Sequence, residues 1–210
     1  MLLAVCVCLH GQTEQPAGAP VKEEIKGMPA RTAPTDYQAH TQVGKLTIAA
    51  EFTGHSIATE DSPLTNDDYI VVETAFYGAA GERVKIGGSD FTLKINGKKE
   101  LPVQPYGMVL ANVKDPNYES PDAVAAKKSK TSLNGGDSAS NDPPPIIHIP
   151  IEVQRAMALK VRKSALPEGE RAVPVAGLIY FRYGGKVKGI HSIELTYSGS
   201  AGTATLNLQP

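Results

Sequence analysis

The residue types that most often do chemistry in proteins are present in this chain, but they form no known catalytic or ligand-binding motif. No two histidines have the H-x-x-x-H or H-E-x-x-H spacing of a zinc site. The triplet Ser198-Gly199-Ser200 closes a predicted strand and opens no helix, unlike the G-x-S-x-G turn of a hydrolase. No glycine-rich phosphate loop lies between a strand and a helix. The sequence therefore predicts a protein that is not an enzyme, with no catalytic, cofactor-binding or metal-binding residues and no cofactor. The histidines are His10, His40, His55, His148 and His191.

An acidic loop is the strongest candidate for a metal site. Glu60, Asp61, Asp67 and Asp68, together with Asn66, lie between two predicted strands. Calcium prefers several oxygen ligands at one point, and a loop can gather them. The spacing differs from that of an EF-hand, and no glycine stands at the bend. Exposed acids in loops are usually only solvated, so a solvated loop is favoured, and a calcium-stabilised adhesion-type domain is kept as an alternative.

The start of the chain is apolar and resembles the centre of a secretory signal peptide. Residues 2–9 are too few to span a bilayer. We expect residues 1–20 to be a signal peptide that lacks its basic start, and the protein to be periplasmic or extracellular; a first β-strand is the alternative. Leu3-Ala4-Val5-Cys6 resembles a lipobox, which would tether the protein through an N-terminal lipid. Cleavage beyond Cys8 would leave no cysteine for a disulfide or a zinc site.

Composition limits the classes of partner. The formal net charge is −1, so no overall field favours nucleic acid or a membrane surface. The chain has no tryptophan, which leaves little material for stacking on bases or sugars. Residues 21–42 are rich in proline and polar residues and build no apolar period, so we expect a disordered linker there. The folded domain should occupy residues 43–210.

The stretch from Val175 to Tyr197 predicts two β-strands joined by a short loop of glycine and lysine. Residues 178–181 are apolar or aromatic at every position, which is typical of a strand buried on both faces. From His191 to Tyr197, apolar and polar residues alternate, which is typical of a strand with one face on a core. The alternation places His191 at the edge of the core. We expect the rest of the chain to pack against this pair.

Other strands are indicated by β-branched and aromatic residues between turn residues. Asn96-Gly97 gives the clearest turn, because this pair suits a type I′ hairpin. The other predicted strands are 45–52, 69–77, 83–86, 91–95, 98–103 and 203–208.

One helix is predicted over residues 151–166, where good helix formers follow Pro150, a residue suited to a first turn. Part of the same segment also alternates as a strand would. Residues 111–148 lack a period and contain many turn residues, so we expect a flexible insertion there.

Short strands and one helix in a long inserted connection predict a mainly β fold, an antiparallel immunoglobulin-like β-sandwich. The segments Y-I-V-V-E-T-A-F-Y-G … G-S-D-F-T-L-K-I-N-G-K, from Tyr69, and G-L-I-Y-F … I-E-L-T-Y, from Gly177, are similar to bacterial secreted immunoglobulin-like domains of unknown function. The resemblance covers roughly half of the chain. It implies an exported, tethered, non-catalytic module.

We therefore expect a binding or structural role at the cell envelope or outside the cell. The partner would be a protein or a surface polymer of unknown identity, with no nucleic acid and no transmembrane span. The alternative from another class is a small secreted hydrolase whose residues meet only in the folded protein.

Overall fold

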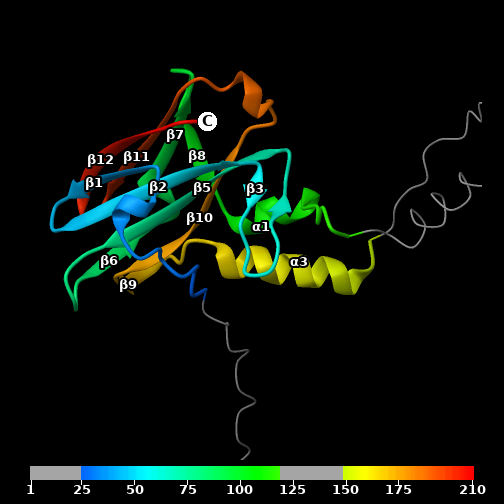
Figure 1. Ribbon diagram of the computed structural model, residues 1–210, viewed down its shortest axis with the longest axis horizontal. Coiled ribbons are helices and arrows are strands. Elements are labelled where there is room, and N and C mark those ends of the chain that lie inside the picture. Colours follow the sequence, from blue (N-terminus) through cyan, green and yellow to red (C-terminus); the bar gives the residue numbers. More distant parts are fainter. Residues whose placement is uncertain (1–24, 119–148) are drawn as a thin grey trace, which may run out of the picture.

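The computed structural model describes residues 25–118 and 149–210, which form a mainly β structure with antiparallel sheets, as predicted (Figure 1). The strands are β1 Ala39–Val43, β2 Leu46–Gly54, β3 Ser56–Ile57, β4 Leu64–Thr65, β5 Tyr69–Tyr77, β6 Arg83–Ile86, β7 Phe91–Ile95, β8 Leu101–Gln104, β9 Gly169–Ala172, β10 Val175–Arg182, β11 Ile193–Gly199 and β12 Gly202–Leu208. The helices are α1 Tyr106–Val109 and α3 Ile151–Ser164, with short 3₁₀ turns η1 Pro34–Asp36, η2 Gly88–Asp90, η3 Leu110–Asn112 and η4 Val187–Gly189.

Eight strands form one sheet in the order β1-β2-β5-β10-β8-β7-β11-β12. The sheet curls until its two edge strands, β1 and β12, lie side by side (Figure 1). The side chain of Gln38, just before β1, donates a hydrogen bond of 2.7 Å to the carbonyl of Gln209, just after β12. Two short ribbons, β3–β4 and β6–β9, flank this nearly closed sheet.

Strand β10 lies in the middle of the sheet and is buried at every position except Arg182. It pairs with β5 along its whole length, from Val175 opposite Phe76 to Arg182 opposite Tyr69. The prediction that this strand has both faces covered is confirmed. A strand made of a continuous run of apolar residues is buried on both faces, because exposing either face to water is unfavourable.

The two strands predicted between Val175 and Tyr197 are present as β10 and β11, but they are not neighbours in the sheet. β11 pairs with β7 on one side and β12 on the other, and two strands separate it from β10. The connecting loop lacks the two-residue turn that forces neighbours to pair, and it contains η4, so the chain is free to cross to the far half of the sheet. The alternation within β11 is confirmed, with Ile193, Leu195 and Tyr197 buried.

The main core fills the space between the two halves of the curled sheet. Its aromatic centre is Phe76 of β5, Phe91 of β7 and Tyr197 of β11. The ring centroid of Tyr197 lies 5.2 Å from that of each phenylalanine. Such tilted and edge-on contacts stabilise by about 0.5–1.5 kcal/mol beyond the burial of their area.

A second core lies between the outer face of β10 and helix α3. Leu178 and Tyr180 of β10 pack with Met157 and Val161 of α3. The helix is as predicted, except that it ends at Ser164, because Ala165 is already extended. Figure 1 shows α3 along the lower side of the sheet.

The Asn96-Gly97 turn is confirmed. Both residues have positive φ, 53° and 65°, as a type I′ turn requires. The Asn96 side-chain oxygen also accepts hydrogen bonds of 2.7 and 3.1 Å from the backbone N–H groups of His191 and Ser192. One residue thus closes its own hairpin and fixes the start of β11.

The prediction of a linker over 21–42 is wrong for residues 25–42. Tyr37 is only 5% exposed, Met28 pairs with Ala176 of β10, and β1 pairs with β2 from Ala39 onward. The prediction fails because the apolar contacts of this segment come from single, widely spaced residues instead of a periodic pattern. Residues 21–24, like the predicted signal peptide 1–20, lie outside the described residues.

The predicted insertion 111–148 is also shorter than expected at its start. Residues 111–118 are described, and Val113 is buried there. Lys114 exchanges two backbone hydrogen bonds, of 2.8 and 2.9 Å, with Thr65 of β4. Residues 119–148 lie outside the described residues. In the described ranges, no helix is long and apolar enough to cross a membrane.

Candidate functional site

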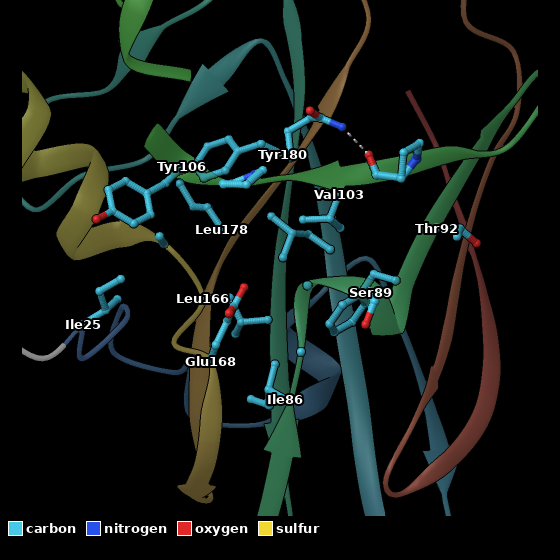
Figure 2. Close-up of a pocket in the computed structure, with 18 of the residues that line it drawn as sticks. Ile25, Ile86, Ser89, Thr92, Val103, Tyr106, Leu166, Glu168, Leu178 and Tyr180 are labelled. Carbon is cyan, nitrogen blue, oxygen red and sulfur yellow. Dashed lines mark hydrogen bonds between the residues drawn. The ribbon is translucent and has the colours of Figure 1, made fainter. Parts of the chain in front are cut away.

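A cavity of about 1110 Å³ opens where β10 separates from β8 (Figure 2). The two strands pair only through Tyr180 opposite Gln104 and Phe181 opposite Val103. Toward its start, β10 has no strand of the main sheet on this side. The cavity occupies that gap and reaches both faces of the strand. Its size is slightly above the range usual for small-molecule sites, about 300–1,000 Å³.

The walls of the cavity are mostly apolar and come from five parts of the chain. The aliphatic and aromatic side chains that line it include Ile86 of β6, Phe91 of β7, Val103 of β8, Leu166 after α3, and Leu178 and Ile179 of β10. Apolar walls of this kind favour the transfer of an apolar molecule from water. They offer no preformed site for a strongly solvated ion.

The gap is kept open by two chain segments that cross the edge of β10. Met28 N donates a hydrogen bond of 2.9 Å to Ala176 O, and Leu166 N donates one of 3.0 Å to Leu178 O. Gly177 permits the second crossing, because a Cβ there would lie 2.5 Å from Leu166 N. These segments satisfy part of the edge of β10 and leave β8 free to diverge from it.

Polar groups occur at two ends of the cavity. Ser89 and Glu168 are exposed and mark the end that opens to solvent. Arg171 also lines the cavity and donates hydrogen bonds of 3.0 Å from Nε and 2.7 Å from Nη2 to the carbonyl of Glu168. Tyr106 and Tyr180 lie near the top of the view in Figure 2, with Glu168 and Ile86 lower down.

Tyr180 is the buried polar residue of the lining, with only 1% of its surface exposed. Its hydroxyl has no hydrogen-bond partner among the described residues. Burial raises the pKa of Tyr180 well above its usual value, so the hydroxyl keeps its proton. The ring packs in the second core with Met157 and Val161 of α3.

The acidic loop does not form a cation site in the structure. Asn66 is buried and structural: its amide nitrogen donates to Val109 O at 2.6 Å, and its oxygen accepts from Asp68 N at 3.0 Å. Asp61 pairs with Lys160 at 3.1 Å. Asp67 pairs with Lys114, and this hydrogen bond holds the pKa of Asp67 below its usual range. Within the described ranges, no group of three acidic, histidine or cysteine side chains could hold a metal ion.

The three described histidines, His40, His55 and His191, lie in different parts of the fold. Nδ1 of His55 lies 2.7 Å from Tyr69 O and its Nε2 lies 3.1 Å from Gly185 O, so this ring joins two loops. His40 is exposed on β1. His191 is exposed, and its predicted place at the edge of the core is wrong, because the strand begins only at Ile193. His10 and His148 lie outside the described residues.

Ser200 of the Ser198-Gly199-Ser200 triplet has a structural role. Its hydroxyl donates a hydrogen bond of 2.9 Å to the carbonyl of Lys85 and accepts one of 3.3 Å from the N–H of the same residue. The hydroxyl therefore closes the free edge of β6 against the β11–β12 turn.

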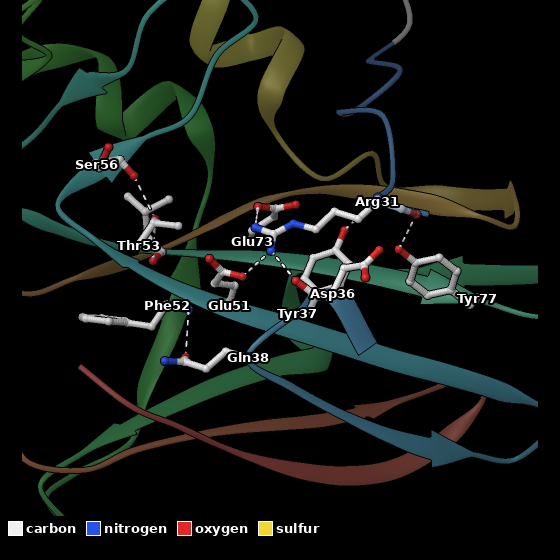
Figure 3. A network of polar contacts seen from close by, with 11 residues as sticks. Arg31, Asp36, Tyr37, Gln38, Glu51, Phe52, Thr53, Ser56, Glu73 and Tyr77 are labelled. Atoms are coloured by element: carbon white, nitrogen blue, oxygen red, sulfur yellow. Dashed lines mark hydrogen bonds and ion pairs between the residues drawn. The ribbon is translucent and has the colours of Figure 1, made fainter. Parts of the chain in front are cut away.

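A polar network on the outer face of β2 and β5 was not predicted from the sequence (Figure 3). Arg31 pairs with Glu51 of β2 and, at 2.8 Å, with Glu73 of β5. Its guanidinium carbon lies 4.4 Å from the centre of the Tyr37 ring, and its carbonyl accepts a hydrogen bond of 2.8 Å from the Tyr77 hydroxyl. The network attaches the segment before β1 to the sheet, which is a structural task.

The sequence contains no local signal for the cavity. Its lining residues come from segments far apart in the chain, and the cavity exists only because two paired strands diverge. Comparisons of the chain with family models, with curated proteins and with solved structures found no match.

Proposed function

We propose that this protein is a non-catalytic binding module that holds an apolar molecule in the cavity between β10 and β8. The observation that supports this proposal is the cavity itself, which is large and has walls from β6, β7, β8 and β10 that are mainly aliphatic and aromatic. A folded domain usually fills such space with its own side chains. A gap of this size is unusual unless something else occupies it.

The energetics are adequate for a small ligand. Removing about 250 Å² of apolar ligand surface from water contributes roughly 6 kcal/mol at about 25 cal/mol per Å². The loss of translational and rotational freedom offsets part of this gain. Because about 6 kcal/mol corresponds to a dissociation constant of about 40 μM before this offset, we expect a ligand of moderate size to bind with a dissociation constant of about 0.1–1 mM.

The cellular setting is a further part of the proposal. The signal-like start and the resemblance to secreted immunoglobulin-like domains support a module that acts at the cell envelope or outside the cell. Apolar molecules have low solubility there, so a carrier or sensor for them is a coherent role. A binding role in place of catalysis is supported by the lining, because Arg171 is engaged by the carbonyl of Glu168 and the walls are otherwise mainly apolar.

The test is to fill the cavity with a side chain of the protein. Gly88 lines the cavity, and a Cβ there would meet only the end of the Glu168 side chain, at 3.1 Å, and Val103 at 4.0 Å. We expect the wild type to bind the apolar dye N-phenyl-1-naphthylamine saturably, with a rise in fluorescence. Gly88→Leu should weaken this binding at least about tenfold, because the new side chain takes the space of the dye.

Gly184→Leu is the matched control. Gly184 is exposed, and a Cβ there would have no atom within 4 Å, so the same substitution adds the same apolar group away from the cavity. Binding should be unchanged. Val103→Phe provides a second filling variant, and melting curves confirm that each variant folds. Absence of saturable binding by the wild type, or equal losses in both glycine variants, would refute the proposal.

A further inference from the structure

Helix α3 packs on the second core with one face, through Met157 and Val161, and its opposite face is exposed to solvent. Figure 1 shows the helix at the margin of the molecule. Residues four positions apart lie in one row on the surface of a helix. One such row on the exposed face alternates between aliphatic and basic residues, and we call it the outer row of α3: Ile151, Arg155, Leu159 and Lys163.

Exposed large apolar side chains are concentrated on α1 and α3. Among the described residues there are three, Met108, Ile151 and Leu159, each between 43% and 57% exposed. Met108 belongs to α1, which contacts α3. A single exposed aliphatic residue needs no explanation. Their concentration on one layer of the molecule, with none on the described strands, indicates a surface that contacts an apolar partner.

The bases of the outer row give this surface a local positive charge that the chain as a whole lacks. α3 contains four basic residues and one acid, Glu152, whereas the formal net charge of the chain is −1. Lys160 pairs with Asp61 at 3.1 Å. Arg155 and Lys163 form no salt bridge with another residue that the structure describes. These two cations, one on each side of Leu159, can therefore bind an anionic partner.

We propose that the outer row docks the protein on the surface of an anionic phospholipid membrane, with α3 parallel to the membrane plane. Ile151 and Leu159 enter the boundary between headgroups and acyl chains, and Arg155 and Lys163 bind lipid phosphate. Helices that lie on membranes combine aliphatic and basic side chains in this way. An acidic protein is a poorer match. The centre of a protein interface is a compact apolar cluster depleted in charge, whereas these two aliphatic residues lie about 12 Å apart along the helix with a base between them.

This surface is separate from the cavity, because no residue of the outer row lines it. Membrane docking therefore does not rest on the proposed function, and either can fail while the other stands. The two are compatible, since a module that holds an apolar molecule must exchange it with the place where such molecules collect.

A single tryptophan placed in the outer row reports on docking directly, because the chain has no tryptophan of its own. Leu159→Trp in the full chain keeps an apolar residue at this exposed position. We expect its emission to shift to shorter wavelength with vesicles of equal parts phosphatidylcholine and phosphatidylglycerol, and to stay unchanged with phosphatidylcholine alone. Gly184→Trp is the control: this position is exposed in the loop after β10, and its emission should shift with neither kind of vesicle.

Two charge variants in the Leu159→Trp chain test the role of the bases. Arg155→Gln with Lys163→Gln should weaken binding to the anionic vesicles about tenfold to thirtyfold, because each base near an anionic surface contributes a factor of about five. Lys98→Gln with Lys99→Gln removes the same charge from two exposed lysines after the Asn96-Gly97 turn, and should change binding by less than about twofold. Melting curves confirm that each variant folds.

The remaining outcomes overturn the proposal. It is refuted if anionic vesicles cause no shift, if both kinds of vesicle cause the same shift, or if the two charge variants lose binding equally. If the emission shifts with protein concentration and not with lipid, the outer row binds a second copy of this chain instead. If soluble poly-glutamate causes the same shift as the anionic vesicles, the partner is an acidic polypeptide and membrane docking is wrong.

Discussion

Glu73 is a carboxylate in the middle of the sheet, and it is only 5% exposed. A charge at such a position is tolerated when a cation and hydrogen bonds accompany it. Arg31 provides both, and Glu51 shares the same guanidinium. Partial burial lowers the pKa of Arg31, but the hydrogen bonds and charges of Glu51 and Glu73 together raise it above its usual value. Arg31 therefore keeps its positive charge.

Removing Arg31 should destabilise the protein strongly. Arg31→Ala leaves the Glu73 carboxylate buried without its cation, and we expect a loss of about 2–4 kcal/mol in the free energy of unfolding, measured in urea. Arg83→Ala is the control, because its pair with Glu170, at 3.1 Å, is between two exposed side chains. The control should lose less than about 1 kcal/mol. Equal losses in the two variants would show that Glu73 does not need its partner.

The sequence contained one local signal for this ion pair. Glu73 interrupts the otherwise apolar and hydroxylated run from Tyr69 to Tyr77, and an acid inside a buried strand calls for a cation. The identity of that cation could not be predicted, because Arg31 is 42 positions away and lies in a segment with no apolar period. The same holds for Tyr180: its burial was predictable, but its lack of a partner was not.

Strand β10 is an element on which both cores depend. Ile179 and Phe181 face the main core, and Leu178 and Tyr180 face the core beneath α3. Each of these four side chains thus belongs to one of two apolar clusters, and β10 forms part of both. Loss of packing on either face should weaken the whole domain.

Phe181→Ala tests this point. Phe181 is fully buried, and the truncation should cost about 3–5 kcal/mol. Lys186→Ala, in the exposed loop after the strand, should change stability by less than about 0.5 kcal/mol. Urea unfolding of both variants gives the comparison. Two equally mild variants would mean that β10 is not central to the stability of the domain.

The elements themselves were largely predictable, and their pairing was not. The period-two alternation of β11, the apolar run of β10 and the Asn96-Gly97 turn are local signals that survive folding. Partner choice depends on which buried faces match across the whole sheet, so adjacency in sequence does not make β10 and β11 neighbours. The cavity follows from that pairing, so it was beyond sequence reasoning as well.

At the scale of the whole molecule, the segment 25–42 belongs to the domain. It supplies Tyr37, Arg31, β1 in part and the pairing of Met28 with Ala176. A chain that begins at Val43 should therefore be about 4 kcal/mol or more less stable than a chain that begins at Ile25. For a domain whose total is about 5–15 kcal/mol, the shorter chain is at the limit of folding.

Thermal and urea unfolding of these two chains measure the difference. Both lack residues 1–24, so the comparison isolates the contribution of 25–42. Similar midpoints would show that the contacts of Tyr37 and Arg31 contribute little, and the sequence-based prediction of a dispensable linker would regain support.

The contact between β1 and β12 affects how readily copies of this protein aggregate. Exposed edge strands present rows of unpaired backbone groups, and through these rows sheets recruit strands from other molecules and grow into fibrils. Here the two edges of the main sheet face each other, and Gln38 joins their ends by its hydrogen bond to Gln209. Each molecule therefore shields the two edges of its main sheet, and a concentrated solution of the folded protein should resist amyloid-like growth through that sheet.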